Sequence, residues 1–275
     1  LLDRYFRHPE QATMELGLSI VGTVPKFRTN RAGVLSVSSM SQVVESFRAL
    51  RLSVQHYFPA GQPVLLCVSS PGAGEGKSLV SSNLAIAFAN SGHKTLLIDG
   101  DVRRGVVHLT FEIERRPGLI DFLGGAARKA GVIRATSTEN LSVITSGARS
   151  RKAPELLVSD HLAALVAEVR QEFEVVIIDS APFAAGMDAY ALSVAAGATL
   201  VVLRPGVSDR KLAAAKLNIL DRLPVAVIGA VLNGISGTGA YRYYYSDYSE
   251  YEIDDVDEDL KEERGPEGLR LIGPP

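Results

Sequence analysis

The stretch "VLLCVSSPGAGEGKS", Val64–Ser78, decides how this chain folds. An apolar run is followed by a glycine-rich loop that ends in Gly-Lys-Ser, and a helical pattern begins at Ser78. Gly72, Gly74 and Gly76 allow the backbone to turn tightly, so that successive N–H groups point into one concavity. Such a concavity suits a phosphate chain, and the positive end of the following helix adds to the attraction. The stretch therefore predicts a strand, a phosphate-binding loop and a helix.

The last two residues of the loop have defined roles in phosphate binding. Lys77 is expected to reach the terminal phosphates, and the Ser78 hydroxyl is expected to bind Mg²⁺. The strict pattern has a glycine five residues before Gly76, where this chain has Pro71. A glycine turn without a ligand is the alternative on the pattern alone, and the flanking strand and helix signals favour a phosphate-binding loop.

Strand-like and helix-like segments alternate along the rest of the chain. Short apolar runs occur at Val64–Val68, Thr95–Ile98, Leu141–Thr145, Val175–Ile178, Thr199–Leu203 and Ala226–Leu232. Helix-like stretches occur at Ser78–Asn90, Pro154–Arg170 and Asp209–Arg222. Runs that are apolar on both faces and joined by helices predict an α/β fold, with a mostly parallel central sheet and helices on both faces. In such folds ligands bind at the carboxyl ends of the strands.

Two of the predicted strands end in aspartates. "LLIDGD" places Asp99 at the tip of one strand with Asp101 just past it, and "VVIIDS" places Asp179 at the tip of another. An isolated aspartate at such a place is more often a helix cap, but two such strands in a chain with Gly-Lys-Ser indicate a shared site. A hard divalent cation that bridges phosphates needs oxygen ligands of this kind.

The composition excludes several classes of protein. Of the 275 residues 46% are hydrophobic and 22% are charged, as in ordinary globular domains. A net charge of -2 gives no basic footprint, so no nucleic-acid partner is expected. The single cysteine, Cys67, excludes an intrachain disulfide and a Cys-x-x-Cys metal site, and we interpret it as a core residue. No segment reaches the ~18 apolar residues that a membrane span requires.

The N-terminal part of the chain is poorly periodic. We interpret residues 1–40 as a linker and an edge element, residues 41–235 as the main domain and residues 236–275 as a tail. The chain begins Leu1-Leu2-Asp3 without a methionine, so we expect it to be part of a longer protein in which a membrane anchor precedes residue 1.

The C-terminal tail has an unusual composition. After a Gly/Ser/Thr-rich joint at 234–239, six of the nine tyrosines lie within eleven residues: Tyr241, Tyr243, Tyr244, Tyr245, Tyr248 and Tyr251. Residues 247–263 include ten acidic residues and one lysine. A segment with so few aliphatic residues cannot bury a core, so we expect disorder there. A sticky or β-forming patch is the alternative interpretation of the tyrosines.

A helix is predicted at Ser41–Tyr57 from its apolar positions. Glu45, Arg48 and Arg51 are three residues apart and therefore lie along one flank of it. A solvated flank with a local ion pair is one interpretation of this spacing. A contact between subunits is the other, because the planar fork of arginine can bind a partner's carboxylate at two points.

Taken together, these motifs resemble those of bacterial tyrosine kinases, which are P-loop proteins of the MinD/ParA-like class. Gly-Lys-Ser, "LLIDGDVRR" and "VVIIDSAP" are similar to the Walker A, Walker A′ and Walker B motifs of that family. "LGLSIVGTVP" resembles the segment that follows the last transmembrane helix of polysaccharide co-polymerase kinases, and "ESFRALR" matches their oligomerisation motif. The tyrosine-rich tail matches their autophosphorylation cluster. The similarity covers most of the chain.

The resemblance implies an ATP- and Mg²⁺-dependent autokinase that regulates capsule or exopolysaccharide synthesis and export. Its implied catalytic residues are Lys77, Asp99 and Asp101, and its implied metal ligands are Ser78, Asp99 and Asp179. The implied nucleotide contacts are Gly72, Ala73, Gly74, Glu75, Gly76, Lys77, Ser78, Leu79 and Arg103, with Asn233 at the adenine. The tail tyrosines are the implied phosphoacceptors, used in trans within a ring that Glu45, Arg48 and Arg51 hold together.

The resemblance also implies partners and a location. These are a transmembrane co-polymerase or activator segment, on the same or a separate chain, and a phosphotyrosine phosphatase, at the cytoplasmic face of the bacterial inner membrane. The chain departs from the family at Ser180-Ala181, where the family has Thr-Pro, and Gly72 replaces the signature lysine of MinD proteins. A MinD/ParA-like ATPase and an ATP-binding scaffold without kinase activity remain the alternatives. A single cysteine excludes a related iron–sulfur carrier.

Overall fold

The computed structural model describes residues 3–27 and 37–236, and for residues 37–40 it describes the backbone alone. The six tail tyrosines and the acidic residues that follow them lie outside this range. The tail prediction is therefore not addressed by the structure.

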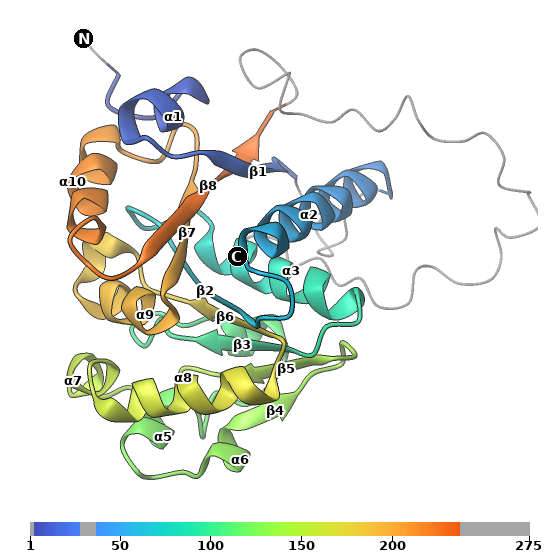
Figure 1. The fold of residues 1–275 in the computed structure, drawn as a ribbon, viewed down its shortest axis with the longest axis vertical. Helices are drawn as coiled ribbons and strands as arrows, with labels where there is room; N and C mark the ends of the chain where they lie inside the picture. Colours follow the sequence, from blue (N-terminus) through green and yellow to red (C-terminus); the bar gives the residue numbers. More distant parts are fainter. Residues whose placement is uncertain (1–2, 28–36, 237–275) are drawn as a thin grey trace, which may run out of the picture.

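The described residues form one eight-stranded sheet in the order β1-β8-β7-β2-β6-β3-β5-β4 (Figure 1). All neighbouring strands are parallel except β4 and β5. The strands are β1 (Ile20–Pro25), β2 (Val64–Ser69), β3 (Thr95–Asp99), β4 (Ile133–Ala135), β5 (Leu141–Ile144), β6 (Val175–Asp179), β7 (Ala198–Leu203) and β8 (Ala226–Ile235).

Helices cover both faces of the sheet (Figure 1). They are α1 (Glu10–Leu16), α2 (Val37–Tyr57), α3 (Lys77–Asn90), α4 (Val107–Thr110), α5 (Leu119–Leu123), α6 (Lys129–Val132), α7 (Ala153–Leu157), α8 (Asp160–Glu172), the 3₁₀ turn η1 (Phe183–Ala185), α9 (Asp188–Ala196) and α10 (Arg210–Leu220). Among the described residues, no helix combines the length and the apolar character needed to cross a membrane.

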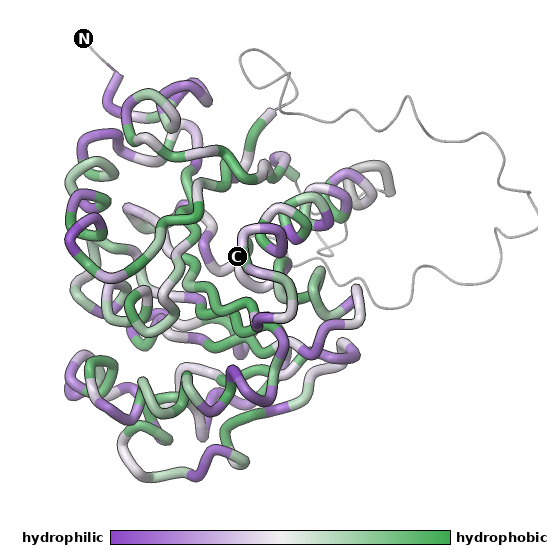
Figure 2. Tube along the Cα trace, viewed as in Figure 1, coloured by the Kyte–Doolittle hydropathy of each residue, from purple (hydrophilic) through white to green (hydrophobic). Residues whose placement is uncertain are grey.

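Alternate side chains of the central strands enter different cores. Leu66 and Val68 of β2 pack with α2 and α3 on one face, whereas Leu65 and Cys67 pack with α8 and α9 on the other. A third cluster joins α1, α9 and α10 to β7 and β8. The central strands are accordingly hydrophobic along their length (Figure 2). Burial on both faces is the reason that they appear in the sequence as continuous apolar runs.

The predicted strands are confirmed, with small shifts at their ends. The predicted helix Pro154–Arg170 is wrong: α7 ends at Leu157 and α8 begins at Asp160. Ser159 is the N-cap of α8 and has extended backbone angles, so the chain leaves the helical conformation there. The short β4, which runs antiparallel to β5, was not predicted, and α2 begins at Val37 rather than Ser41.

Candidate active site

The glycine-rich loop connects β2 to α3 at the carboxyl end of the sheet. Gly74 and Gly76 have φ angles of 78° and 95°, in the left-handed region that favours glycine. Gly76 is the N-cap of α3 and has no side chain to cap it, so the first N–H groups of the helix remain for phosphate oxygens. Phosphate binding by this loop stays a prediction, and the backbone geometry is compatible with it.

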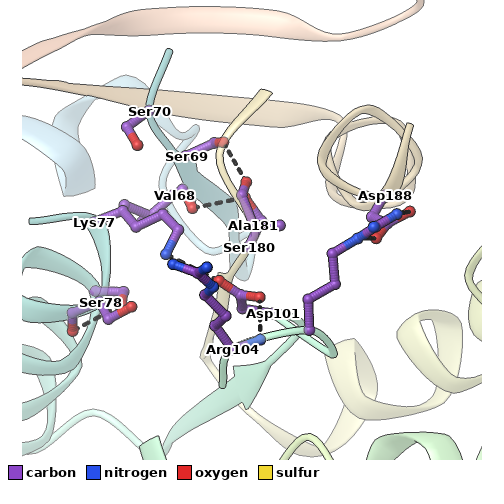
Figure 3. Close-up of polar contacts among 12 residues, drawn as sticks. Val68, Ser69, Ser70, Lys77, Ser78, Asp101, Arg104, Ser180, Ala181 and Asp188 are labelled. Carbon is purple, nitrogen blue, oxygen red and sulfur yellow. Dashed lines mark hydrogen bonds and ion pairs between the residues drawn. The ribbon is translucent and has the colours of Figure 1, made fainter. Parts of the chain in front are cut away.

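The segment after β6 holds the loop in place. The N–H groups of Phe183 and Ala184 donate to the carbonyls of Ser70 and Pro71 at 2.9 and 3.1 Å. The Ser180 hydroxyl donates to the carbonyl of Val68 at 3.1 Å (Figure 3). Ser180, where the family has threonine, thus ties the β6 exit to β2. These bonds fix the loop next to the aspartate that ends β6.

Asp99 and Asp179 lie side by side because β3 and β6 pair in parallel with these two residues in register. Both are fully buried, and none of their carboxylate oxygens has a well-formed hydrogen bond to a described residue. Burial, with the charges of Asp179 and Asp101, raises the pKa of Asp99 well above its ordinary value. Burial also raises the pKa of Asp179 to about 6, although the Lys77 ammonium opposes the shift.

Lys77 points toward Asp101 (Figure 3). Its Nζ lies 3.1 Å from Oδ2 of Asp101, whose Oδ1 accepts the Arg104 N–H at 2.9 Å. Burial lowers the pKa of Lys77, but the three neighbouring aspartates outweigh it and raise the pKa above its ordinary value. The lysine therefore stays charged, as a phosphate-binding group must.

The site fits a nucleotide with Mg²⁺. Neither buried carboxylate has a well-formed hydrogen bond to a described residue, and only weaker contacts oppose their burial, from Ser78 and Ser81 to Asp179 and from the backbone of Val107 and Asp101 to Asp99. A single ammonium group, that of Lys77, faces three aspartates, so the site favours an added cation or proton. Among the described residues no group of three or more acidic, histidine or cysteine side chains forms a complete metal cage. Mg²⁺ is usually held by one or two carboxylates together with phosphates and waters, which is what this site offers.

Glu75 has a role that the motif did not reveal. Its side chain folds back under the loop, where its Oε1 accepts the Gly72 N–H at 3.1 Å. Burial raises the pKa of Glu75 to about 8, against weaker opposing hydrogen bonds from Ser208 and Gly72. Of the other predicted loop contacts, Ala73 and Gly74 are exposed at the tip, and Leu79 is half-buried against the core.

Two arginines and one asparagine near the loop have protein partners that the sequence alone did not indicate. Arg103 forms an ion pair with Asp188 of α9, with Nε–Oδ2 at 2.7 Å, and is thereby held away from Lys77. Asn233 donates from Nδ2 to the carbonyl of Glu75 at 2.8 Å. Arg204, which no motif singled out, donates to the carbonyl of Gly74 at 3.0 Å.

The α2 flank lies apart from this site. Arg48 forms an exposed ion pair with Glu45 at 3.2 Å, and Arg51 donates to Gln55 at 3.1 Å. The local ion pair that the spacing allowed is therefore present. Nε of Arg51 is buried without a hydrogen-bond partner among the described residues.

The chain is similar to a known domain family and to several characterised proteins. A family described as an AAA domain matches residues 65–208. The tyrosine-protein kinase ptk of Acinetobacter johnsonii is 31% identical over 84% of this chain and 33% of its own length. The tyrosine-protein kinase YwqD of Bacillus subtilis is 32% identical over 73% of this chain and 85% of its own length. The chain spans about a third of the Acinetobacter relative.

Solved structures agree. The kinase domain of Escherichia coli tyrosine kinase ETK superposes with a TM-score of 0.76 at 30% identity, covering 84% of this chain and 95% of that domain. The septum site-determining protein MinD from Pyrococcus horikoshii, solved with Mg-ADP, superposes with a TM-score of 0.54 at 23% identity, over 61% of this chain and 69% of MinD. The second likeness shows the fold alone, which is a MinD-like P-loop fold.

Proposed function

The chain belongs to the family of bacterial tyrosine-protein kinases, and from that premise we propose that it transfers the γ-phosphate of ATP to tyrosine hydroxyls. The observation that supports this most is the pair of buried aspartates, Asp99 and Asp179, beside Lys77 at the end of a glycine-rich loop. Phosphoryl transfer needs positioning and charge neutralisation more than covalent chemistry, and these residues supply both.

Each residue has a role in this proposal. The amides of residues 72–76 and the Lys77 ammonium would hold the phosphates, and Ser78, Asp99 and Asp179 would hold Mg²⁺. Mg²⁺, when bound, neutralises charge on the phosphate oxygens. Arg103 reaches a phosphate only after it releases Asp188, and Asn233 offers Oδ1 to the adenine.

The acceptor hydroxyl also needs a group that takes its proton. A phenol has a pKa of ~10, so a nearby carboxylate with a raised pKa promotes its attack. We assign this role to Asp99, because it matches the first aspartate of the family's Walker A′ motif and lies in register beside Asp179 at the end of its strand. Asp101 lies beside it and orients Lys77.

The proposed acceptors are Tyr241, Tyr243, Tyr244, Tyr245, Tyr248 and Tyr251, presented to a neighbouring subunit of a ring. Six phenols on one tether supply a high local concentration of acceptor. We place the ring contact on Glu45, Arg48 and Arg51. The whole protein is proposed to act at the cytoplasmic face of a bacterial inner membrane, with a co-polymerase or activator segment and a phosphatase, in polysaccharide export.

A phosphorylation assay tests the activity. The purified chain is incubated with ATP and Mg²⁺ and probed for phosphotyrosine, beside Lys77→Met and a matched Lys211→Met variant on the exposed part of α10. We expect signal from the wild-type chain and from Lys211→Met, and none from Lys77→Met. Phosphate released to water without phosphotyrosine would instead favour a MinD/ParA-like ATPase. ATP binding without turnover would favour a scaffold.

A mixing experiment tests transfer between subunits. Lys77→Met chains, which keep their tyrosines, are mixed with active chains whose six tail tyrosines are changed to phenylalanine. Phosphotyrosine on the Lys77→Met chains supports transfer in trans. Its absence, when wild-type chains form phosphotyrosine under the same conditions, contradicts it.

A further inference from the structure

A basic pocket lies beside the active site, between the loop that follows β3, the start of α7 and the start of α9. Its volume is about 370 Å³, and Val102, Arg103, Arg149, Arg151, Pro154 and Asp188 are among the residues that line it. Val102 and Arg103 directly follow Asp101, the carboxylate that binds Lys77. The pocket therefore begins next to the reacting groups.

The pocket has positive charge that no described residue neutralises. Its one acidic lining residue, Asp188, is already paired with Arg103 through contacts of 2.7 and 3.4 Å. Arg149 and Arg151 are exposed, and in the part of the chain that the structure describes they have no ion pair or side-chain hydrogen bond. Two free guanidinium groups in a concave wall attract carboxylates at two points each.

The tail of this chain has carboxylates placed beside its tyrosines. Asp247 directly precedes Tyr248, and Glu250 and Glu252 flank Tyr251. A tyrosine that enters the active site therefore brings an acidic neighbour to the adjoining wall. This charge complementarity selects the tail over other surface segments as the occupant of the pocket.

Chain length permits this contact. The nine Cα–Cα steps from Ser236 to Tyr245 can span at most about 30 Å. Five strand spacings of ~4.8 Å, or about 24 Å, separate β8 from β5 in the sheet. A tail is therefore long enough to reach the pocket of its own subunit.

We propose that Arg149 and Arg151 form a specificity pocket that binds the acidic residues next to an acceptor tyrosine, with Asp247, Glu250 and Glu252 of the tail as its ligands. One consequence of this pocket, a preference for acceptor tyrosines with acidic neighbours, rests on the proposed kinase function. The binding itself requires neither ATP nor phosphoryl transfer.

A binding experiment tests the pocket. A fluorescent peptide of residues 241–253 is titrated with the full 275-residue chain without ATP, and its anisotropy is recorded at low and at moderate salt. We expect Arg149→Glu/Arg151→Glu to weaken binding about 10-fold, with a smaller salt dependence, because exposed ion pairs are modest and screened. The matched control is Arg170→Glu/Arg222→Glu, an equal charge change at two exposed positions. Arg170 lies near the end of α8 and Arg222 just after α10, so both come before the amino ends of the next strands, β6 and β8.

Charge reversal on both sides makes the test specific. A peptide with Asp247→Lys, Glu250→Lys and Glu252→Lys should bind the reversed pocket better than the wild-type pocket. The proposal would be overturned if the wild-type peptide bound with equal affinity to the wild-type chain, to the Arg149→Glu/Arg151→Glu chain and to the control chain. If the pocket variant loses peptide binding but the wild-type chain makes no phosphotyrosine with ATP and Mg²⁺, the proposed kinase function fails and the pocket remains.

Discussion

The carboxyl edge of the central strands and the outer flank of α2 both gather charged side chains, but in opposite ways. At the sheet edge, Asp99 and Asp179 are 0% exposed and their oxygens have no well-formed hydrogen bond to a described residue. On α2, the side chains of Arg48 and Glu45 are 60% and 36% exposed and pair with each other at 3.2 Å.

The difference shows which charged groups indicate a ligand when only a single chain is known. A buried carboxylate without partners is destabilising, so its presence indicates a ligand that the fold alone does not contain. An exposed ion pair contributes little to stability and is compatible with an ordinary solvated surface. The role of the sheet edge can therefore be argued from one subunit, whereas that of the α2 flank depends on a second one.

The largest effect is expected from a change at Asp99, the buried carboxyl at the sheet edge. Asp99→Asn should lower the rate of phosphotyrosine formation by about 100-fold or more, because a group that acts in the transition state is lost. The same change should stabilise the nucleotide-free chain by about 1–3 kcal/mol, because asparagine avoids the cost of either burying or protonating this carboxyl near neutral pH. Initial rates and urea unfolding measure the two effects.

The control for this prediction is an aspartate that is equally buried but paired. Asp188→Asn breaks the ion pair with Arg103 and should therefore destabilise the chain. If Asp99→Asn destabilised the chain as much as Asp188→Asn does, the contrast between paired and unpaired carboxylates would be wrong.

Two glycines of the loop form the second test. Gly76 and Gly74 both have left-handed backbones, but a Cβ at Gly76 would overlap Nδ2 of Asn233, whereas a Cβ at Gly74 meets nothing within 4 Å. Gly76→Ala should cost about 2–4 kcal/mol, and Gly74→Ala only the ~1 kcal/mol of backbone strain. Urea unfolding compares them, and equal losses would show that the Asn233 contact is unimportant.

The pH dependence of stability tests the buried acid under the loop. The pKa of Glu75 is about 8 in the folded chain against an ordinary value of 4.5. Between these values the folded chain binds more protons than the unfolded chain, so stability falls as pH rises. Glu75→Gln keeps the acceptor for the Gly72 N–H but removes the titration. Between pH 5 and 8.5 the wild-type chain should lose up to about 4 kcal/mol of stability through this group, and Glu75→Gln should not show this loss. Thermal unfolding measures both chains, and an equal pH dependence in the two would contradict the assignment.

The smallest effect on stability is expected at the α2 flank. Changing Glu45, Arg48 and Arg51 together to Ala should alter the free energy of unfolding by less than about 1 kcal/mol, because the ion pair is exposed. If the flank joins subunits, light scattering should nevertheless show monomers, whereas His56→Ala on the same helix should leave the assembly intact. An unaltered assembly of the triple variant would remove the ring contact from this flank.

Much of the fold was predictable because its strands are buried on both faces. Their continuous apolar runs mark them clearly, and helical connections make neighbouring strands parallel. The break between α7 and α8 was missed because apolar residues recur on both sides of it, although Ser159, a residue type favoured at N-caps, marks the start of α8. The three residues of β4 are partly exposed and too few to show alternation.

The site was predictable in part for a similar reason. Parallel strands end at one edge, so Asp99 and Asp179 had to come close to the loop that follows β2. The motif grouped Arg103 with the phosphates and Asn233 with the adenine, but it could not show that each already has a protein partner. Glu75 looked like one more loop residue until its carboxylate was found buried against Gly72.

By itself the sequence determined the P-loop architecture, because strand and helix patterns are local and the topology of a parallel sheet then places every strand end on one edge. Only the tertiary structure decided which charges are buried, paired or free. Arg103 and Asp188 are 85 positions apart, and Asn233 and Glu75 are 158 apart. Such partners are selected by three-dimensional packing, which no local pattern encodes. Only the tertiary structure likewise showed that Arg149 and Arg151 line a pocket without a partner among the described residues.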